Sequence, residues 1–182
     1  LGNRSRELGV TVGTLCGGAF AYMAGVWNAA DECLLSIADG EQTVVPAYCQ
    51  WTADTTVANF LTALAGQTAT ARSHAEACPY DEACELTGIA PRLMFAFGDS
   101  AEPMDITDDT LLFALSHRDG KLELTVTYQT TAYTDAFIDS MTDTYAMVLG
   151  GFIACERLAD IQFCSAEMTA RLEALNHAMP AA

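Results

Sequence analysis

The sequence has 182 residues, 51% of them hydrophobic, and a formal net charge of −16 with only eight lysines and arginines. A chain of this length can bury one substantial core, and we expect a single domain over residues 1–176 and a loose tail at 177–182. The shortage of basic residues excludes binding to nucleic acid and to anionic membrane surfaces, because phosphate groups are held by clustered lysine and arginine. No apolar run reaches the roughly 18 residues of a membrane span, and no signal peptide is recognisable. We therefore expect a cytoplasmic protein and, since the first residue is Leu1, a piece of a longer chain or a processed product.

The seven cysteines form no recognisable metal or disulfide pattern. Their number is odd, and no C-x-x-C pair occurs. The spacings between Cys78 and Cys84 and between Cys155 and Cys164 do not fit a zinc site. We expect buried, reduced thiols and no bound metal.

The first predicted helix starts after Thr11 or Thr14 and ends near Asn28. Apolar residues recur there at helical spacing, and threonine is a favoured cap at a helix start. The helix contains three glycines, Gly13, Gly17 and Gly18. No strand precedes them, as a dinucleotide-binding loop requires, so we expect them to let the helix pack closely against its neighbours.

Two strands are predicted next. Cys33–Ala38 is continuously apolar, and Thr43–Trp51 is rich in residues that favour strands. Pro46 interrupts the second strand and predicts an edge position or a bulge, because proline cannot donate a backbone hydrogen bond. Residues 39–42 are expected to join the two strands in a tight turn.

Two helices and a further strand follow. A long helix begins near Asp54 and Thr55 and presents one apolar face, made by Val57, Phe60, Leu61 and Leu64. Pro79 then opens a short helix that ends before Gly88, in keeping with the preference for proline at helix starts and glycine after helix ends. Arg92–Phe97 predicts a strand, and the acidic residues 99–109 predict a loop.

A hairpin is predicted at the centre of the second half. Asp119-Gly120 is a strong turn signal between two strand-like runs. After the turn, one face carries Leu122, Leu124, Val126 and Tyr128. The first arm, Leu111–Leu115, is apolar on both faces, so we expect packing on both sides of it. If helices cover only one side, the other is expected to be an interface.

The rest of the sequence predicts two helices. The first is capped by Thr134 and has an apolar face at spacings of three and four, made by Phe137, Met141, Tyr145, Val148, Phe152 and Cys155. The second runs from Ser165 to Asn176. Together the elements predict an α/β fold of the α+β two-layer sandwich type, with one mixed sheet of about five strands and helices mainly on one face.

Several motifs in this order resemble a known family. They are SHAEACPYDEACELTG at Ser73–Gly88, PRLMFAF at Pro91–Phe97, the hairpin ending in Tyr128, the helix from Thr134, and IQFCSAE at Ile161–Glu167. The set resembles the C-terminal lobe of the condensation domain of nonribosomal peptide synthetases, which has the chloramphenicol-acetyltransferase-like fold. The resemblance covers nearly the whole chain.

The resemblance implies an active site between two lobes, in which an amine attacks a thioester. It implies an N-terminal condensation lobe and peptidyl carrier protein domains as partners. No cofactor is expected on this chain itself, because the phosphopantetheine arms belong to the carrier proteins.

The sequence departs from the family in two places. The family's catalytic His-His-x-x-x-Asp motif is absent, and the only histidines are His74, His117 and His177. The resemblance makes His74 a structural residue, so we assign no catalytic residue. Between the first two strands, where the family has a longer segment that forms the floor of the substrate tunnel, only the short turn remains. We expect Thr43 and Tyr128 to face the cleft between the two lobes.

Three functions remain open at this point. The first is a condensation-domain lobe that is inactive alone. Whether the chain belongs to an active enzyme therefore stays open. The second is a non-catalytic lobe for scaffolding or carrier-protein docking. The third is a stand-alone acyltransferase of the acetyltransferase type, which would need a catalytic histidine. For the isolated lobe we also expect an exposed apolar surface and self-association that increases with salt.

Overall fold

The computed structural model describes residues 1–39, 43–98, 110–118 and 121–163. Within these residues the helices are α1 (Gly2–Glu7), α2 (Val12–Trp27), α3 (Val57–His74), α4 (Tyr80–Thr87), α5 (Asp135–Ala154) and the 3₁₀ turn η1 (Leu158–Asp160). The strands are β1 (Glu32–Asp39), β2 (Val44–Gln50), β3 (Leu93–Phe97), β4 (Leu111–Arg118) and β5 (Lys121–Thr127). The turn at 119–120, the loop at 99–109, and the helix and tail predicted after residue 164 lie outside the described residues.

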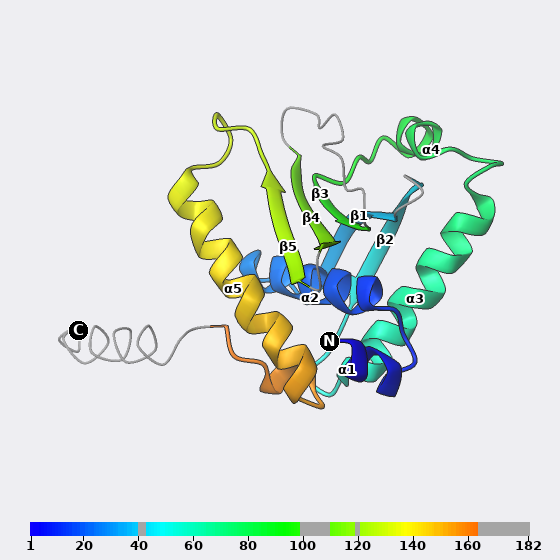
Figure 1. Cartoon of the computed structure of the whole chain (residues 1–182). Helices are drawn as coiled ribbons and strands as arrows, with labels where there is room; N and C mark the ends of the chain where they lie inside the picture. Colours follow the sequence, from blue (N-terminus) through cyan, green and yellow to red (C-terminus); the bar gives the residue numbers. More distant parts are fainter. Residues whose placement is uncertain (40–42, 99–109, 119–120, 164–182) are drawn as a thin grey trace, which may run out of the picture.

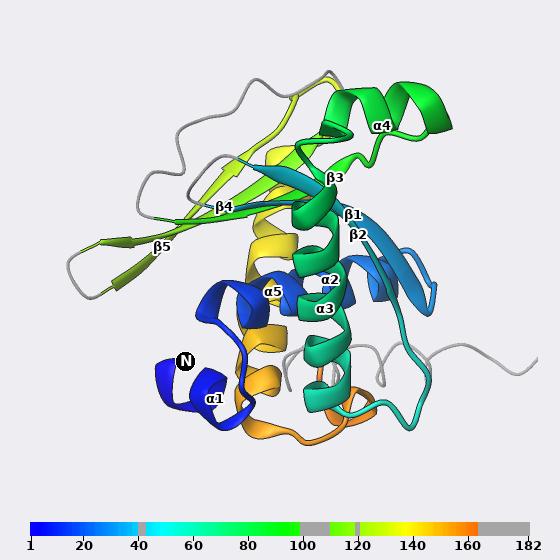
Figure 2. The ribbon, with the colours of Figure 1, turned by 90° about the vertical axis from the view of Figure 1, so that its right-hand side faces the viewer.

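The five strands form one mixed sheet in the order β2-β1-β3-β4-β5 (Figure 1). The three central strands are parallel, and each outer strand is antiparallel to its neighbour. Helices α2, α3 and α5 cover one face, and α4 lies on the other (Figure 2). The predicted mixed sheet of about five strands, with helices mainly on one face, is therefore confirmed.

Aromatic rings fill the core between the helices and the sheet. The ring of Phe20 on α2 lies 4.6 Å from that of Phe113 on β4 and 5.9 Å from that of Phe95 on β3, centre to centre. Tyr145 on α5 meets Phe113 edge-on at 5.6 Å. All four side chains are buried, so the core joins α2 and α5 to β3 and β4 by direct ring contact.

The second face of the sheet is also buried at its centre, whereas Leu34 and Tyr48 near the β2 edge of that face are 38% and 43% exposed. Its centre is a row of three alanines, Ala38, Ala96 and Ala114, which lie opposite one another on β1, β3 and β4. Leu112 beside them is 1% exposed. Packing on both sides of Leu111–Leu115 is thus confirmed, and the alternative, an interface on the second face of this arm, is wrong.

Helix α4 is attached to this second face by a hydrogen bond. The hydroxyl oxygens of Ser36 on β1 and Tyr80 on α4 are 2.6 Å apart. Ser36 is fully buried. Without Tyr80, its hydroxyl group would therefore be buried without this hydrogen bond, which costs free energy. Gly88 ends α4 in the left-handed conformation, which confirms the predicted stop.

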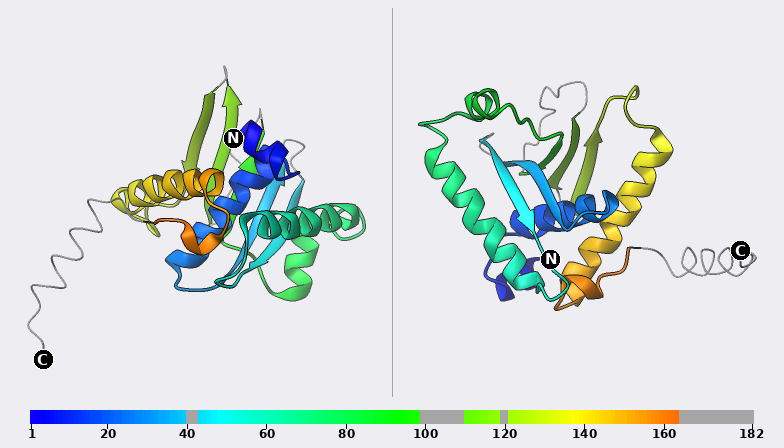
Figure 3. Two further views of the ribbon diagram at one scale, coloured as in Figure 1. Left: turned by 90° about the horizontal axis from the view of Figure 1, so that it is seen from below. Right: turned by 180° about the vertical axis from the view of Figure 1, so that it is seen from behind.

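The start of α3 and the end of α5 lie beside α1 near the N-terminus (Figure 3). The backbone N–H of Val57 at the start of α3 donates to the carbonyl oxygen of Glu156, just after α5, at 2.9 Å. From α1, Arg4 donates to the carbonyl oxygen of Cys155 at 3.1 Å. Helix α1 is missing from the sequence prediction because residues 1–9 are mostly polar and its stabilising contacts are with residues about 150 positions away.

Each long helix is capped by a threonine. The side chains of Thr11, Thr56 and Thr134 accept from the backbone N–H three residues later. The threonine caps predicted for α2, at Thr11, and for α5, at Thr134, are therefore confirmed. Helix α3 starts at Val57, slightly later than expected, because Thr56 rather than Asp54 or Thr55 is the capping residue.

The outer edges of the sheet are protected in different ways. In β2, Pro46 has no N–H to offer, and the N–H of Tyr48 donates to the side-chain oxygen of Gln67 on α3 at 3.2 Å. The edge position predicted from Pro46 is therefore confirmed. In β5, Leu122, Leu124 and Val126 face the core as predicted, but they are only half-buried, because β5 is the other edge strand.

No helix in the described part of the chain is long and apolar enough to cross a membrane.

Candidate functional site

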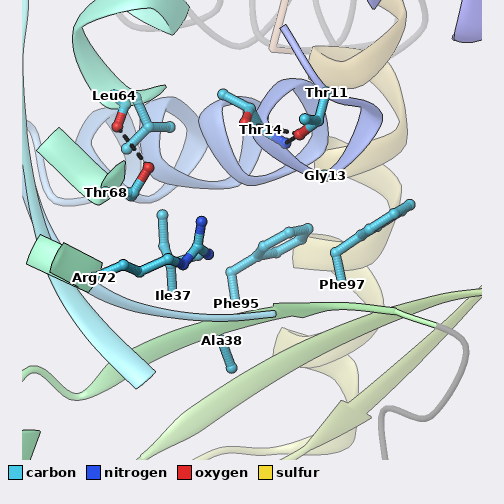
Figure 4. A pocket seen from close by; sticks show the side chains of 10 residues that line it. All are labelled: Thr11, Gly13, Thr14, Ile37, Ala38, Leu64, Thr68, Arg72, Phe95 and Phe97. Atoms are coloured by element: carbon cyan, nitrogen blue, oxygen red, sulfur yellow. Dashed lines mark hydrogen bonds between the residues drawn. The ribbon is translucent and has the colours of Figure 1, made fainter. Parts of the chain in front are cut away.

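A cavity of about 200 Å³ lies at the carboxyl end of the parallel strands. Helix α2 begins above it, the last turns of α3 close one side, and β1 and β3 form its floor (Figure 4). Its walls are formed by Thr11, Gly13, Thr14, Ile37, Ala38, Leu64, Thr68, Arg72, Phe95 and Phe97. Sites in α/β folds commonly form at this end of a sheet, and concave apolar pockets with a few polar groups are typical of ligand sites.

Two glycines on α2 determine the shape of this cavity. A Cβ atom on Gly13 would lie 3.0 Å from the ring of Phe97, and one on Gly17 would lie 3.0 Å from the ring of Phe95. The helix can therefore approach β3 closely enough to place both rings under its first two turns. Phe95 is fully buried and forms the floor, whereas Phe97 is half-buried and lies nearer the entrance.

The threonines of the cavity use their hydroxyl groups in local hydrogen bonds. The side-chain oxygen of Thr11 accepts from the N–H of Thr14 at 3.0 Å, and the hydroxyl of Thr68 donates to the carbonyl oxygen of Leu64 at 3.0 Å. Arg72, in the last turn of α3, is half-buried and is the one charged residue among the described residues that line the cavity. Its side chain extends across the floor of the cavity toward Phe95 (Figure 4).

None of the three buried cysteines in the described part of the chain is activated for chemistry. Burial raises the pKa of the thiols of Cys16, Cys33 and Cys49 to about 12, about 11 and about 12. A thiol reacts as its thiolate, so these three groups are inert near neutral pH. Burial also raises the pKa of Tyr145, whose hydroxyl donates to the carbonyl oxygen of Cys16 at 3.1 Å.

The histidines do not form a catalytic arrangement. His74 ends α3, and His117 lies in β4; both are exposed and neither lines the cavity. His177 lies outside the described residues. Among residues that the structure describes, no group of three metal-ligating side chains could hold an ion.

The two residues predicted to face a cleft lie far apart in the fold. Thr43 is half-buried just before β2, at the same end of the sheet as the cavity. Tyr128 follows β5 at the other end and the other edge, and its hydroxyl donates to Asp135 at 2.7 Å. The structure does not bring them into one site, and their facing a cleft stays a prediction.

Sequence reasoning missed the cavity itself. The glycines of α2 predict close helix packing and Arg92–Phe97 predicts a strand, but nothing in the sequence indicates that Gly13 packs against Phe97. That pairing depends on the crossing of α2 over β3, which only the tertiary structure defines.

No family model matches this sequence, and no curated protein matches it in sequence. Solved structures match its fold. The X-domain from teicoplanin biosynthesis aligns over 90% of this chain with a TM-score of 0.73 at 15% identity, and that domain has also been solved in complex with OxyB. The first condensation domain of the CDA synthetase aligns over 90% with a TM-score of 0.69 at 11% identity. The condensation domain of the Monacolin K polyketide synthase aligns over 85% with a TM-score of 0.69 at 17% identity.

The chain spans less than half the length of these domains, 46%, 45% and 44% respectively. Such coverage is consistent with a C-terminal lobe, the half to which the sequence motifs pointed. The chain therefore has the fold of one lobe of a condensation domain, and the predicted chloramphenicol-acetyltransferase-like architecture is confirmed.

Proposed function

We propose that this chain is the C-terminal lobe of a condensation domain and acts together with an N-terminal lobe that carries the catalytic histidines. The observation that supports this most is the match of nearly the whole chain to less than half of several condensation domains. A lobe with its own closed core, matched in this way, is expected to function as one wall of a two-lobed site.

In this proposal the chain positions substrates, and the partner lobe supplies proton transfer. A general base typically contributes about 10²–10⁴-fold to a rate, and the exposed, separate His74 and His117 are not placed to provide it. The carboxyl end of the sheet, with its cavity beside the first turns of α2, would face the partner lobe. Holding a reactant in an attacking geometry lowers the barrier without any chemical group.

The reaction of the assembled domain would be aminolysis of a thioester. The amine of the acceptor attacks the carbonyl carbon of the donor, the C–S bond breaks, and the donor thiol leaves with one proton. Both substrates would arrive on phosphopantetheine arms of carrier proteins, in a cytoplasmic synthetase. The product is an amide on the acceptor arm.

A second candidate is a lobe that docks another protein and performs no condensation. It is favoured by the connection between β1 and β2, which consists only of residues 40–43, whereas the family has a longer segment there to form the tunnel floor. The X-domain, solved in complex with OxyB, is a neighbour of this fold that has been captured with a protein partner. The stand-alone acyltransferase has no supporting observation among the described residues.

We expect the isolated chain to form no amide. It should be incubated with aminoacyl-loaded donor and acceptor carrier proteins, and the dipeptidyl thioester sought by mass spectrometry. Dipeptide above the background without protein would contradict the proposed division of roles, because it would place the base on this chain.

The same assay on a longer chain separates the two candidates. The longer chain should include the polypeptide encoded upstream of Leu1, in which we expect a His-His-x-x-x-Asp motif. Product that disappears when the second histidine becomes alanine supports the condensation lobe. An upstream lobe that binds carrier proteins without forming product, or that lacks the motif, supports the docking lobe instead.

A further inference from the structure

The cavity at the carboxyl end of the sheet has the size of one aromatic ring with a short attachment. Its volume is about 200 Å³. A protein cavity of about 150 Å³ lined by leucine, isoleucine and phenylalanine side chains is known to bind benzene. A water molecule takes about 30 Å³ of liquid volume, so the difference of about 50 Å³ leaves space for roughly two further non-hydrogen atoms. An occupant of the size of a benzyl group therefore matches this space.

Apolar side chains from three elements form much of the wall of the cavity. Leu64 on α3, Ile37 on β1 and Phe95 on β3 are buried, and Phe97 is half-buried. The rings of Phe95 and Phe97 both point from β3 toward α2 (Figure 4). An aromatic occupant can therefore make with them the offset and edge-to-face contacts that aromatic pairs prefer.

The threonine hydroxyl groups of the wall are already engaged within the protein. The hydroxyl oxygens of Thr11 and Thr14 are 2.9 Å apart, and the hydroxyl of Thr68 donates to the carbonyl oxygen of Leu64 at 3.0 Å. These three hydroxyl groups keep their hydrogen bonds when the cavity is filled by an apolar group. Such an occupant therefore avoids the free-energy cost of leaving them buried and unsatisfied.

Arg72 adds a preference among apolar occupants of similar size. It lines the cavity, and its side chain extends across the floor toward Phe95 (Figure 4). A guanidinium group interacts favourably with the face of an aromatic ring and stacks on it. A saturated ring has no π-electrons and offers no such interaction. Arg72 therefore favours an aromatic ring over an aliphatic one.

We propose that the cavity binds the aromatic ring of a substrate, with a benzyl group as the size that fits. The ring enters past Phe97, lies against Phe95 and contacts the guanidinium group of Arg72. That the ring is carried by an aminoacyl or small acyl group rests on the proposed function, whereas the binding of the ring itself does not.

The first test uses benzyl alcohol as the probe and the whole chain as the protein. Amide chemical shifts measured by NMR during a titration should change in a saturable way at Gly13, Thr14 and Phe95. Cyclohexylmethanol, the saturated compound with the same number of non-hydrogen atoms, should bind at least about threefold more weakly, the lower part of the range for a cation on a ring face. Equal dissociation constants for the two compounds, or shift changes that lie elsewhere in the chain, would overturn the proposal.

Variants of β3 test the aromatic wall. Phe97→Ala should weaken the binding of benzyl alcohol about threefold to tenfold, the range for the loss of one aromatic pair. Leu93→Ala is the matched control, because Leu93 lies on the same face of the same strand, is also half-buried and does not line the cavity. Its affinity should equal that of the unmodified chain. Equal affinities of the two variants, both shown to be folded by their melting temperatures, would contradict the proposed site.

A variant of α3 tests the preference for an aromatic ring. Arg72→Met keeps a long apolar side chain and removes the charge. It should bring the dissociation constants of benzyl alcohol and cyclohexylmethanol together, because the cation that favours the aromatic ring is gone. An unchanged preference for benzyl alcohol would overturn the role given to Arg72.

A last titration tests whether an amino acid can carry the ring. N-acetyl-phenylalaninamide should shift the same amides and compete with benzyl alcohol, and N-acetyl-alaninamide should do neither. Binding of benzyl alcohol without binding of N-acetyl-phenylalaninamide would overturn the aminoacyl substrate and leave the ring site standing. A longer chain that forms no amide would instead contradict the proposed function, and the binding of benzyl alcohol would be unaffected by that result.

Discussion

Replacing Gly25 by alanine is expected to lower the free energy of unfolding by about 3 kcal/mol, the upper part of the range for overpacked cores. A Cβ atom at this position would lie 2.2 Å from the ring of Trp51 and 2.8 Å from the backbone carbonyl oxygen of Glu32. A flexible side chain could move away, but a backbone oxygen in β1 cannot move without disturbing the sheet. Trp51 itself is buried against Tyr22, with ring centres 5.1 Å apart, so it has little room to shift.

Gly66→Ala is the matched control for this substitution. Gly66 lies within α3, and a Cβ atom there would meet nothing within 4 Å. Alanine is favoured over glycine in a helix interior, so the free energy of unfolding should rise by about 0.5–1 kcal/mol. Urea denaturation of both variants measures these effects. A loss below about 0.5 kcal/mol for Gly25→Ala, the range of ordinary surface changes, would show that α2 does not lie this close to β1 and Trp51.

Replacing Phe113 by alanine is expected to lower the free energy of unfolding by about 3–5 kcal/mol, as large-to-small changes in a core do. Phe113 is fully buried and contacts the rings of Phe20 and Tyr145, so its removal leaves a cavity between two helices and the sheet.

Leu124→Ala on the adjacent strand is the comparison for Phe113→Ala. Leu124 was predicted from its alternating pattern to face the core, and it does, but only half-buried at the edge strand. We therefore expect a loss of about 1–2 kcal/mol, because part of the side chain is already in contact with water. Equal losses for the two variants would contradict the assignment of β5 to an edge and β4 to the centre of the core.

Local signals in the sequence were sufficient to predict most of the fold. Threonine caps at Thr11 and Thr134, the edge position of Pro46 and the stop at Gly88 each depend on one residue and its near neighbours. The alternation in β5 indicated its inner face for the same reason. These features arise from backbone hydrogen bonding and side-chain periodicity, which a single sequence displays directly.

The features that the sequence did not reveal depend on contacts between distant segments. Helix α1 is stabilised by Arg4 reaching the end of α5. The cavity requires Gly13 to meet Phe97, and the ring contact between Trp27 and Phe137 requires the end of α2 to meet the start of α5. The self-association expected from the apolar arm Leu111–Leu115 loses its main argument, since that arm is buried on both faces within one chain.

The central claim is that the functional end of this lobe is the carboxyl end of its sheet. Amide hydrogen exchange tests it most directly, measured on the chain alone and on the longer chain that includes the polypeptide encoded upstream of Leu1. We predict slower exchange in the longer chain at the first turn of α2, from Thr11 to Leu15, and in β3, from Leu93 to Phe97, with no change around Trp27 and Phe137. Unchanged exchange in these two segments, or protection confined to the residues around Trp27 and Phe137, would contradict the account.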